Sequence, residues 1–389
     1  MRTTEILFFA ALFIVFYTYI GYGILLYLLV RIKRVLKPSP RRDLSPFEPE
    51  ITILVAAYNE KDFVKRKVEN TRALEYPKDK LRQIWVTDGS NDSTPELLKE
   101  YPEVTVLHLD ERRGKIAAMN RAMKLIDTPY VIFSDANTML SEGSVRVIAD
   151  LFRNPKTGCV SGEKRIRNSA SDGAAGAGEG IYWRYESTLK KWDAELYSAV
   201  GAAGELFAIR TELFREVEPD TLLDDFIISL RVAMSGYKID YNPNAYAIEA
   251  PSESVKEELK RKIRIAAGGI QSIVRLLPLL NIFKYKTLSF QYISHRVLRW
   301  TLAPVLLPFI FFLNAALAWG SQSYLALFIA QILFYSLAAL GWILQSREIK
   351  VKALFIPYYF LIMNYAVYRG FFRYLAGKQS VNWERAKRG

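Results

Sequence analysis

The sequence is poor in the residues that form disulfides and soft-metal sites. Its 389 residues include one cysteine, Cys159, and two histidines, His108 and His295. A single cysteine excludes an internal disulfide, and it cannot supply a cysteine cluster for a metal ion. The two histidines lie too far apart in the sequence to suggest a metal site. This usage fits a chain that works in a reducing compartment.

Other familiar signatures are also missing. There is no internal repeat, and the one biased stretch, Ser169–Gly180, reads SASDGAAGAGEG. Its glycines follow no expected strand and open no dinucleotide motif, so this stretch is predicted to be a flexible active-site loop. The net charge is 53 − 40 = +13, yet no nucleic-acid-binding motif accompanies it, and we expect no nucleic-acid partner. The basic balance suits anionic lipid head groups and an anionic ligand.

Charge is almost absent from long apolar runs at both ends of the chain. The first, Ile6–Val30, is long enough to cross a bilayer as a helix and shows no small-residue cleavage site, so it is predicted to be a retained anchor. Three further runs near the C-terminus have the length of a span and aromatic residues at their borders. They are Leu302–Trp319, Leu325–Leu344 and Ala353–Phe371. The alternative for all of these runs is a set of buried core helices.

Basic residues predict the orientation of these spans. The cluster Arg31, Lys33, Arg34 and Lys37 follows the first run and favours a cytoplasmic central domain with the N-terminus outside. Four spans would return the C-terminus to the outside, whereas the basic tail favours the inside. The tail residues concerned are Lys378, Arg385, Lys387 and Arg388. A re-entrant or interfacial C-terminal segment therefore stays open, within a multi-pass protein of a bacterial or archaeal cell membrane.

Strand-like and helix-like segments alternate between the apolar ends. The expected strands are Ile51–Ala57, Gln83–Thr87, Val104–Leu107 and Tyr130–Phe133, and the expected helices are Glu60–Ala73, Thr94–Tyr101 and Lys115–Ile126. This alternation predicts βαβ units and a mostly parallel α/β sheet covered on both faces. Ligands of such sheets bind beyond the carboxyl ends of the strands.

Polar residues follow three of these strands directly. The three stretches are Ala57–Glu60, Thr87–Asp92 and Ser134–Asn137. Turn and helix-cap chemistry would account for any one of them, because Asp, Asn, Ser and Gly are the usual residues there. Three such stretches at the same edge of one sheet favour a ligand site.

These motifs, taken in order, resemble the family 2 inverting glycosyltransferases with a GT-A fold. The closer likeness is to the membrane-bound branch of hyaluronan, chitin-oligosaccharide, poly-N-acetylglucosamine and cellulose synthases. It runs from about Pro49 to Gly269 and includes VAAYNE, TDGSND, RGK, DAN and LDDF. The resemblance implies a Rossmann-like GT-A domain between transmembrane helices. The expected divisions are an anchor at 1–36, the GT-A domain at 37–255, amphipathic interfacial helices at 256–294, and a C-terminal region of about three helices at 295–389.

The resemblance also implies a nucleotide-sugar donor, with UDP favoured over other nucleotides. The first motif would lie against the base, and Asp88 would accept a hydrogen bond from the uracil or ribose. Gly114 would allow close approach of the diphosphate, and Lys115 would add positive charge there. The implied donor-binding residues are Ala57, Tyr58, Glu60, Asp88, Gly114, Lys115, Asp135, Arg261 and Arg264.

Two motifs depart from the family pattern. Asp135 and Asn137 stand where the family has its DxD, the site of a divalent Mg or Mn ion, and the asparagine lowers the charge of that site. Arg261 and Arg264 stand in the place of QxxRW, where Arg264 keeps the register for pairing with a diphosphate. Ile265 replaces the tryptophan, which favours a short-chain or lipid-linked product over a long polymer.

By the same resemblance, Asp225 is the general base that takes the proton from the acceptor hydroxyl. Asp224 would tune it or contact the acceptor, and Gly204 and Glu205 would form part of the acceptor pocket. Attack from the face opposite the leaving diphosphate would give a β-linkage to a glycan or a lipid-linked acceptor. The alternative for the two aspartates is plain capping of a helix.

A second hypothesis belongs to another class. A non-catalytic membrane subunit could bind a nucleotide sugar within a polysaccharide synthase complex. The altered DxD is its support, while Asp88, Asp135 and Asp225 favour an enzyme.

Overall fold

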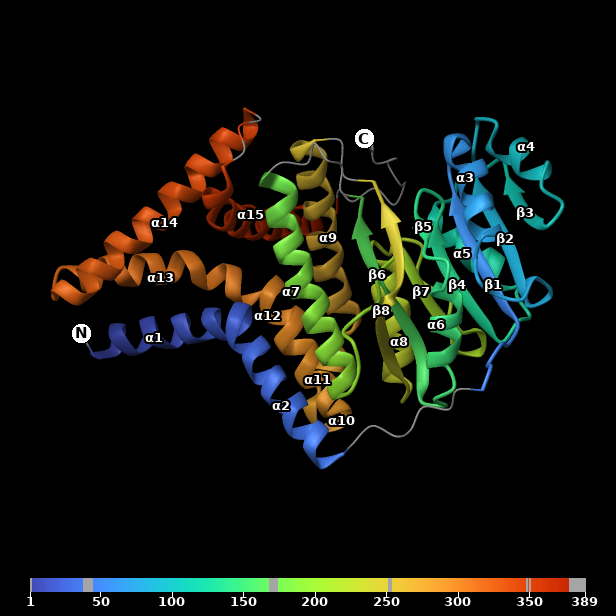
Figure 1. Ribbon diagram of the computed structural model, residues 1–389. Helices are drawn as coiled ribbons and strands as arrows, with labels where there is room; N and C mark the ends of the chain where they lie inside the picture. Colours follow the sequence, from blue (N-terminus) through green and yellow to red (C-terminus); the bar gives the residue numbers. More distant parts are fainter. Residues whose placement is uncertain are drawn as a thin grey trace. The chain divides into compact units, whose positions relative to one another are not determined.

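The computed structural model describes residues 2–37, 45–167, 174–250, 254–347, 349 and 351–377, with side chains throughout except at 2, 174–182, 255 and 352. These residues form two compact units (Figure 1). Among the described residues, the sheet unit comprises 32–37, 45–167 and 190–250, and the helical unit comprises 2–31, 174–189 and those between 254 and 377. Each unit is described by itself below.

One eight-stranded sheet forms the centre of the sheet unit, in the order β3-β2-β1-β4-β7-β6-β8-β5. Strands β1 to β4 pair in parallel, β7 is antiparallel to both β4 and β6, and β5 is antiparallel to β8. The prediction of a mostly parallel sheet is therefore confirmed, with two reversed strands that the alternation did not predict. The strands are β1 Ile51–Ala57, β2 Leu81–Asp88, β3 Val104–Leu109, β4 Tyr130–Asp135, β5 Met139–Leu140, β6 Thr157–Ile166, β7 Leu206–Arg210 and β8 Lys238–Glu249.

Helices cover both faces of this sheet, as predicted. Every residue of β1 is buried, which is typical of a strand with helices on both sides. On one face Ile53 joins a core that includes Val64 of α3 and Ile148 of α6, while α5 contacts β1 and β2 outside that core. The helices of this unit are α3 Lys61–Arg72, α4 Thr94–Lys99, α5 Lys115–Met123, α6 Ser144–Leu151 and α8 Asp224–Met234.

Cys159 lies on β6 with no exposed surface. Burial raises the pKa of its thiol, and the negative charge of Asp240 adds to the effect. The thiol is therefore part of the core, consistent with the absence of a role for it in the sequence.

Pairing register brings the predicted motifs to one edge. Ala57 at the end of β1 pairs with Thr87 of β2, and Ala56 pairs with Asp135 at the end of β4. The turns that follow β1, β2 and β4 therefore leave the sheet side by side.

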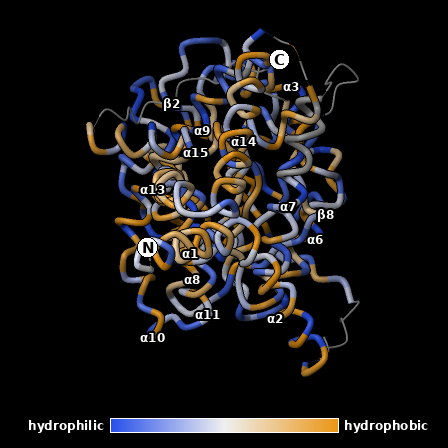
Figure 2. Tube along the Cα trace, turned by 90° about the vertical axis from the view of Figure 1, so that its left-hand side faces the viewer, coloured by the Kyte–Doolittle hydropathy of each residue, from blue (hydrophilic) through white to orange (hydrophobic). Residues whose placement is uncertain are grey.

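The helical unit contains the apolar segments. The helix formed by α1, a π-helical turn and α2 is long and apolar enough to cross a membrane over Thr3–Leu36, and so is α14. A third candidate is the pair of helical segments Thr287–Trp300 and Leu302–Ala318, bent by 53°. Hydrophobic residues predominate along α13 and α14 in Figure 2. These helices indicate a membrane protein.

The last apolar run forms helix α15, which is not among these candidate spans. Its place in or on a membrane stays a prediction. Gly370 of α15 packs closely on α9, since a Cβ at that position would lie 2.7 Å from the Cβ of Ala266. The remaining helices are α1 Arg2–Phe16, α2 Tyr22–Leu36, α7 Ala174–Leu196, α9 Val255–Arg275, α10 Ile282–Tyr285, α11 Thr287–Tyr292, α12 Leu298–Trp300, α13 Leu302–Ala318, α14 Gln322–Ser346 and α15 Phe355–Leu375.

The prediction of a flexible loop over Ser169–Gly180 is wrong in part. Residues 168–173 lie outside the described residues, but α7 begins at Ala174 and runs through Gly180. Alanine has the highest helix propensity, and the alanines of this stretch offset glycines that each cost about 1 kcal/mol in a helix. The basic tail of residues 378–389 also lies outside the described residues.

Candidate active site

Two asparagines lock the turns after β1 and β2 together. Asn59 has a positive φ of 54°, a conformation that asparagine tolerates better than most residues. Its side-chain Nδ2 donates to Asn91 Oδ1 (2.7 Å), and its Oδ1 accepts from the backbone N–H of Asn91 (2.9 Å). This reciprocal pair fixes the two turns that frame the site.

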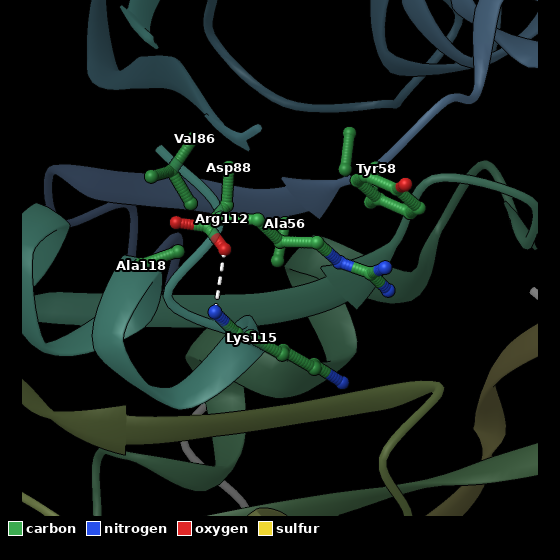
Figure 3. Close-up of a pocket in the computed structure, with 9 residues that line it drawn as sticks. Ala56, Tyr58, Val86, Asp88, Arg112, Lys115 and Ala118 are labelled. Atoms are coloured by element: carbon green, nitrogen blue, oxygen red, sulfur yellow. Dashed lines mark hydrogen bonds between the residues drawn. The ribbon is translucent and has the colours of Figure 1, made fainter. Parts of the chain in front are cut away.

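Asp88 offers one carboxylate oxygen to a ligand. Its Oδ2 accepts from the backbone N–H groups of Arg113 (2.9 Å) and Gly114 (2.6 Å), and the second bond is the dashed line in Figure 3. Its Oδ1 is buried and has no hydrogen-bond partner. A buried acceptor left without a partner is unfavourable, so this oxygen is suited to an N–H or O–H group of a bound molecule.

A pocket that is open to solvent lies beside Asp88. The guanidinium of Arg112 lies 3.7 Å from the centre of the Tyr58 ring at one side of the pocket (Figure 3). The walls are mostly apolar or aromatic with a few polar groups, which is typical of small-molecule sites. The lining residues are Ala56, Ala57, Tyr58, Val86, Asp88, Arg112, Gly114, Lys115 and Ala118.

Lys115 lies between two of the predicted carboxylates. Its Nζ donates to Asp135 Oδ1 (3.0 Å) and lies 3.6 Å from Asp224 Oδ2. Burial disfavours the charged form of Lys115, but the charges of Asp135 and Asp224 outweigh it and raise the pKa of the ammonium. Lys115 begins α5 and Asp224 begins α8, so the starts of two helices meet at the end of β4.

Asp225 has the pKa expected of a general base. Burial, together with the negative charges of Asp224 and Glu205, raises its pKa to about 7, although Lys115 acts in the opposite direction. The absence of a side chain at Gly204 allows this carboxylate to approach closely, because a Cβ there would lie 3.3 Å from Asp225 Oδ2. The aspartate can therefore accept a proton near neutral pH.

Ser229 ties the Gly204 loop to helix α8. Its Oγ accepts from the backbone N–H of Ala202 (3.0 Å) and donates to the backbone oxygen of Asp225 (2.6 Å). Gly201 has a φ of +89°, and a Cβ there would lie 2.2 Å from the Phe226 ring. These contacts hold the loop against the start of α8. Ser229 is not among the residues predicted from the sequence.

Lys164 was also missed. Its ammonium, on β6, donates to Glu205 Oε1 (2.5 Å) and to Glu249 Oε2 on β8. The side chains of Lys164 and Glu249 are 4% and 3% exposed. This buried ion triad fixes the side chain of Glu205 next to the loop of Gly204.

A third missed residue, Lys67 of α3, anchors the turn after β4. It has no exposed surface, and its Nζ donates to Ser134 Oγ (2.7 Å) and to the backbone oxygen of Thr138 (2.7 Å). Burial lowers its pKa to about 7, with Asp135 acting in the opposite direction. Both ends of the turn that carries Asp135 are therefore held by one side chain.

Replacing Lys67 by methionine should displace that turn and lower kcat/KM by about tenfold, because small misplacements of reacting groups are costly. The folded protein binds the Lys67 proton less tightly than the unfolded chain, so wild type should gain stability as pH rises from about 7 to about 10. The difference in Tm, wild type minus Lys67→Met, should increase over that window. Lys65→Met, at an exposed position of the same helix, is the control. A Tm difference that is flat with pH would contradict the burial argument.

The structure brings most of the predicted residues together. Tyr58, Asp88, Gly114 and Lys115 share the pocket, and Lys115 contacts both Asp135 and Asp224. Glu60 instead is buried where α3 begins, with its N–H donating to Thr94 Oγ1 (2.9 Å), and is not a lining residue.

Arg261 and Arg264 belong to α9 of the helical unit. Arg261 lies 3.3 Å from Glu258 on the same helix. The role of these two arginines at a diphosphate stays a prediction.

Asp135 and Asn137 fit a hard divalent cation by their chemistry. They offer carboxylate and amide oxygens, which Mg and Mn prefer. The structure gives the half-buried Asn137 side chain no hydrogen bond with any described residue. Within the described ranges, no group of three Asp, Glu, His or Cys side chains is arranged to hold a metal ion. The two residues would be a partial ligand set at most, and their role at a cation stays a prediction.

Comparisons with known proteins find glycosyltransferases and polysaccharide synthases. Residues 52–218 match the family Glycosyl transferase family 2. The poly-beta-1,6-N-acetyl-D-glucosamine synthase of Staphylococcus aureus (strain MSSA476) is 29% identical over 283 residues, which cover 71% of this chain and 67% of that protein. The synthase of the same name from Staphylococcus epidermidis is 28% identical over 233 residues, covering 58% of this chain and 56% of that protein.

A solved structure extends the likeness in fold beyond the matched domain. The mannosyltransferase PcManGT from Pyrobaculum calidifontis, in complex with GDP-Man and Mn2+, has a TM-score of 0.72 over 96% of this chain and 100% of that chain. Its sequence identity is 22%, so the likeness is one of fold. Together with the family match over residues 52–218, it confirms the resemblance drawn from the motifs, which is one to family 2 glycosyltransferases with a GT-A-like fold.

Proposed function

We propose that this protein is a membrane-bound inverting glycosyltransferase. It transfers a sugar from a UDP-sugar to a glycan or lipid-linked acceptor and forms a β-glycosidic bond. The observation that carries the proposal is Asp225, a carboxylate with a pKa of about 7 that lies close against Gly204. A base with that pKa is matched to removing a proton from a sugar hydroxyl at neutral pH.

The pocket beside Asp88 supports the assignment of a UDP-sugar as the donor. Tyr58 offers an aromatic face for a base, and Asp88 Oδ1 is a single buried acceptor. Uracil presents one N–H on its pairing edge and therefore suits one available oxygen, whereas guanine presents N–H groups from two adjacent nitrogens. This favours UDP, although the structural neighbour PcManGT was solved with GDP-Man.

The leaving diphosphate needs positive charge as the glycosidic bond breaks. A divalent cation, Mg or Mn, held by Asp135 and Asn137 would supply Lewis-acid stabilisation there. Lys115, which already lies at Asp135, supplies a second positive charge on the protein itself. Gly114, with φ of +93°, turns the chain so that its backbone can come close to a phosphate.

On the acceptor side, Asp225 takes the proton from the attacking hydroxyl. Asp224 and Glu205 keep the proton affinity of Asp225 high by their negative charge. In-line attack opposite the leaving group converts an α-linked donor into a β-linked product. The replacement of QxxRW by residues 261–265 favours a short-chain or lipid-linked product.

We place the sheet unit in the cytoplasm. Lys33 and Arg34 follow the first candidate span and are joined to the end of α7 within the sheet unit. Lys33 Nζ donates to the backbone oxygen of Glu195 (2.6 Å), and Arg34 pairs with the Glu195 carboxylate (2.5 Å). Basic residues next to a span favour the cytoplasmic side. The membrane lipids are then a partner of the helical unit.

The test is donor hydrolysis and transfer by the full chain purified in detergent. A panel of UDP-, GDP- and dTDP-sugars is incubated with Mg or Mn, with and without membrane-lipid extract. We expect a UDP-sugar to release its nucleotide and to label an acceptor. If no donor is turned over under any of these conditions, the protein is instead a non-catalytic nucleotide-sugar-binding subunit, for which the asparagine at position 137 would be the reason.

A further inference from the structure

We propose that Lys115 is an internal counter-ion that keeps free divalent cations out of the Asp135 site until a nucleotide diphosphate draws it away. This inference rests on the proposed function, because it assigns a task to Lys115 before the donor binds. It predicts that the cation and the nucleotide bind together, with each increasing the affinity for the other.

The geometry places the ammonium where an incoming cation would bind. Lys115 Nζ donates to Asp135 Oδ1 at 3.0 Å and lies 3.6 Å from Asp224 Oδ2. The side chains of Asp135 and Lys115 are 15% and 17% exposed. A divalent ion at Asp135 Oδ1 would replace the ammonium as its partner, and the two cations would repel each other across a few ångströms in a partly buried site.

When Lys115 leaves Asp135, its ammonium needs another anionic partner. Its other acidic neighbours include Asp224, 3.6 Å away, and Asp225, so leaving Asp135 removes the nearest of the negative charges that compensate this buried ammonium. A diphosphate in the pocket that Lys115 lines would give the ammonium an anionic partner. The nucleotide therefore makes the exchange of Lys115 for a divalent cation favourable.

The small number of protein ligands supports the same coupling. Asp135 and Asn137 would supply two of the six oxygen positions that Mg requires, and the rest would come from the ligand and water. Coupling between two ligands is reciprocal in free energy, so a cation should also tighten nucleotide binding. The ammonium of Lys115 adds a repulsion that opposes cation binding in the absence of nucleotide. A small number of protein ligands would not by itself add this repulsion.

The experiment is Mn²⁺ binding to the full chain in detergent, followed by the loss of the free-ion signal in electron paramagnetic resonance. At pH near 8 and without nucleotide, Lys115→Met should bind Mn²⁺ at least about tenfold more tightly than wild type. Adding UDP or GDP should tighten wild type by at least about tenfold and Lys115→Met by much less. Equal nucleotide-free affinities of wild type and Lys115→Met would overturn the proposal.

Three further variants make the result specific. Lys115→Arg keeps the positive charge and should exclude Mn²⁺ as wild type does. Lys115→Met combined with Asp135→Asn should lose the gained affinity, which places it at Asp135. Lys124→Met removes a lysine of the same segment that pairs with Glu216 at 2.9 Å, and it should behave as wild type.

Two outcomes separate this proposal from the proposed function. The role of Lys115 can be tested with the wild-type protein alone. If wild type binds Mn²⁺ tightly and UDP and GDP do not change the affinity, the role of Lys115 is overturned, even if Lys115→Met fails to fold. If neither nucleotide binds, the donor assignment fails, while the nucleotide-free comparison of wild type with Lys115→Met still decides the role of Lys115.

Discussion

Asp225→Asn should lower sugar transfer by about 10²–10⁴-fold while donor binding is kept, because it removes the general base and leaves the donor pocket unchanged. In wild type, kcat/KM should rise with pH to a plateau just above pH 7, following the raised pKa of Asp225. The measurement is steady-state transfer over pH 5–9 together with nucleotide binding by titration calorimetry.

The control for this variant is Asp110→Asn, at a fully exposed carboxylate paired with His108. It should retain wild-type transfer and the wild-type pH profile. Transfer by Asp225→Asn within tenfold of wild type would reject Asp225 as the base, and an unchanged Asp110→Asn would show that the assay is sound.

Asp225 should also lower the stability of the folded protein when its carboxylate is ionised. The folded protein binds the Asp225 proton more tightly than the unfolded chain, since the pKa rises from 3.8 to about 7. Stability therefore falls as pH rises between about 4 and 7, by roughly 1–2 kcal/mol once relaxation is allowed for. Asp225→Asn lacks this loss, so its Tm should exceed that of wild type at pH 8 and approach it at pH 4. A lower Tm at pH 8 would contradict the burial of like charge at this position.

Asp135→Ala should lower kcat by roughly 10²-fold or more and abolish the dependence on added cation, because a Lewis acid supplies several kcal/mol of charge stabilisation in such reactions. The matched variant is Asn137→Asp, which restores the second carboxylate of the family motif. It should tighten Mn²⁺ binding and lower the Mn²⁺ concentration for half-maximal activity.

Two measurements are needed to interpret Asp135→Ala. Mn²⁺ titrations of activity give the cation dependence, and thermal unfolding shows whether the turn still folds. Undiminished cation dependence in a folded Asp135→Ala protein would assign the cation to other residues, and a looser Mn²⁺ site in Asn137→Asp would argue against Asn137 as its neighbour.

The positions of the first four strands along the chain could be predicted because each is a short, mostly apolar run between expected turns and helices. The prediction of Ile51–Ala57 agrees with β1 to the residue. The second half of the sheet was not predicted. Strand β7 pairs antiparallel with both β4 and β6, which lie far from it in the sequence. Such pairing depends on non-local contacts that a local pattern of hydrophobic residues does not encode.

The polar residues beneath the site were missed for a different reason. Lysine is almost never fully buried, so composition alone argues against Lys67. Its position carries a signal nonetheless: Val64, Lys67, Val68 and Thr71 follow the i, i+3, i+4, i+7 spacing of one helix face, and all four are buried. A charged residue inside such a stripe is a reason to search for acceptors in a neighbouring turn.

The motif residues themselves were predictable because their chemistry is local. A strand end followed by Asp88, or a turn with Asp135, appears directly in the sequence, and parallel pairing brings both to one edge. Ser229 and Lys164 could not be found in this way. Their roles depend on hydrogen bonds to Ala202 and Glu205, which only the folded chain places within reach.

Because Cys159 is buried, the wild-type protein is suitable for site-specific labelling at introduced cysteines. Its thiol is fully buried and its raised pKa keeps the reactive thiolate scarce, so maleimide reagents should leave the native protein unmodified. A cysteine introduced at Ser321, just before α14, would then be the one reactive position, and membrane-impermeant reagents applied to intact cells would report which side it faces. A second introduced cysteine on the sheet unit would give a distance by spin labelling without any prior removal of native thiols.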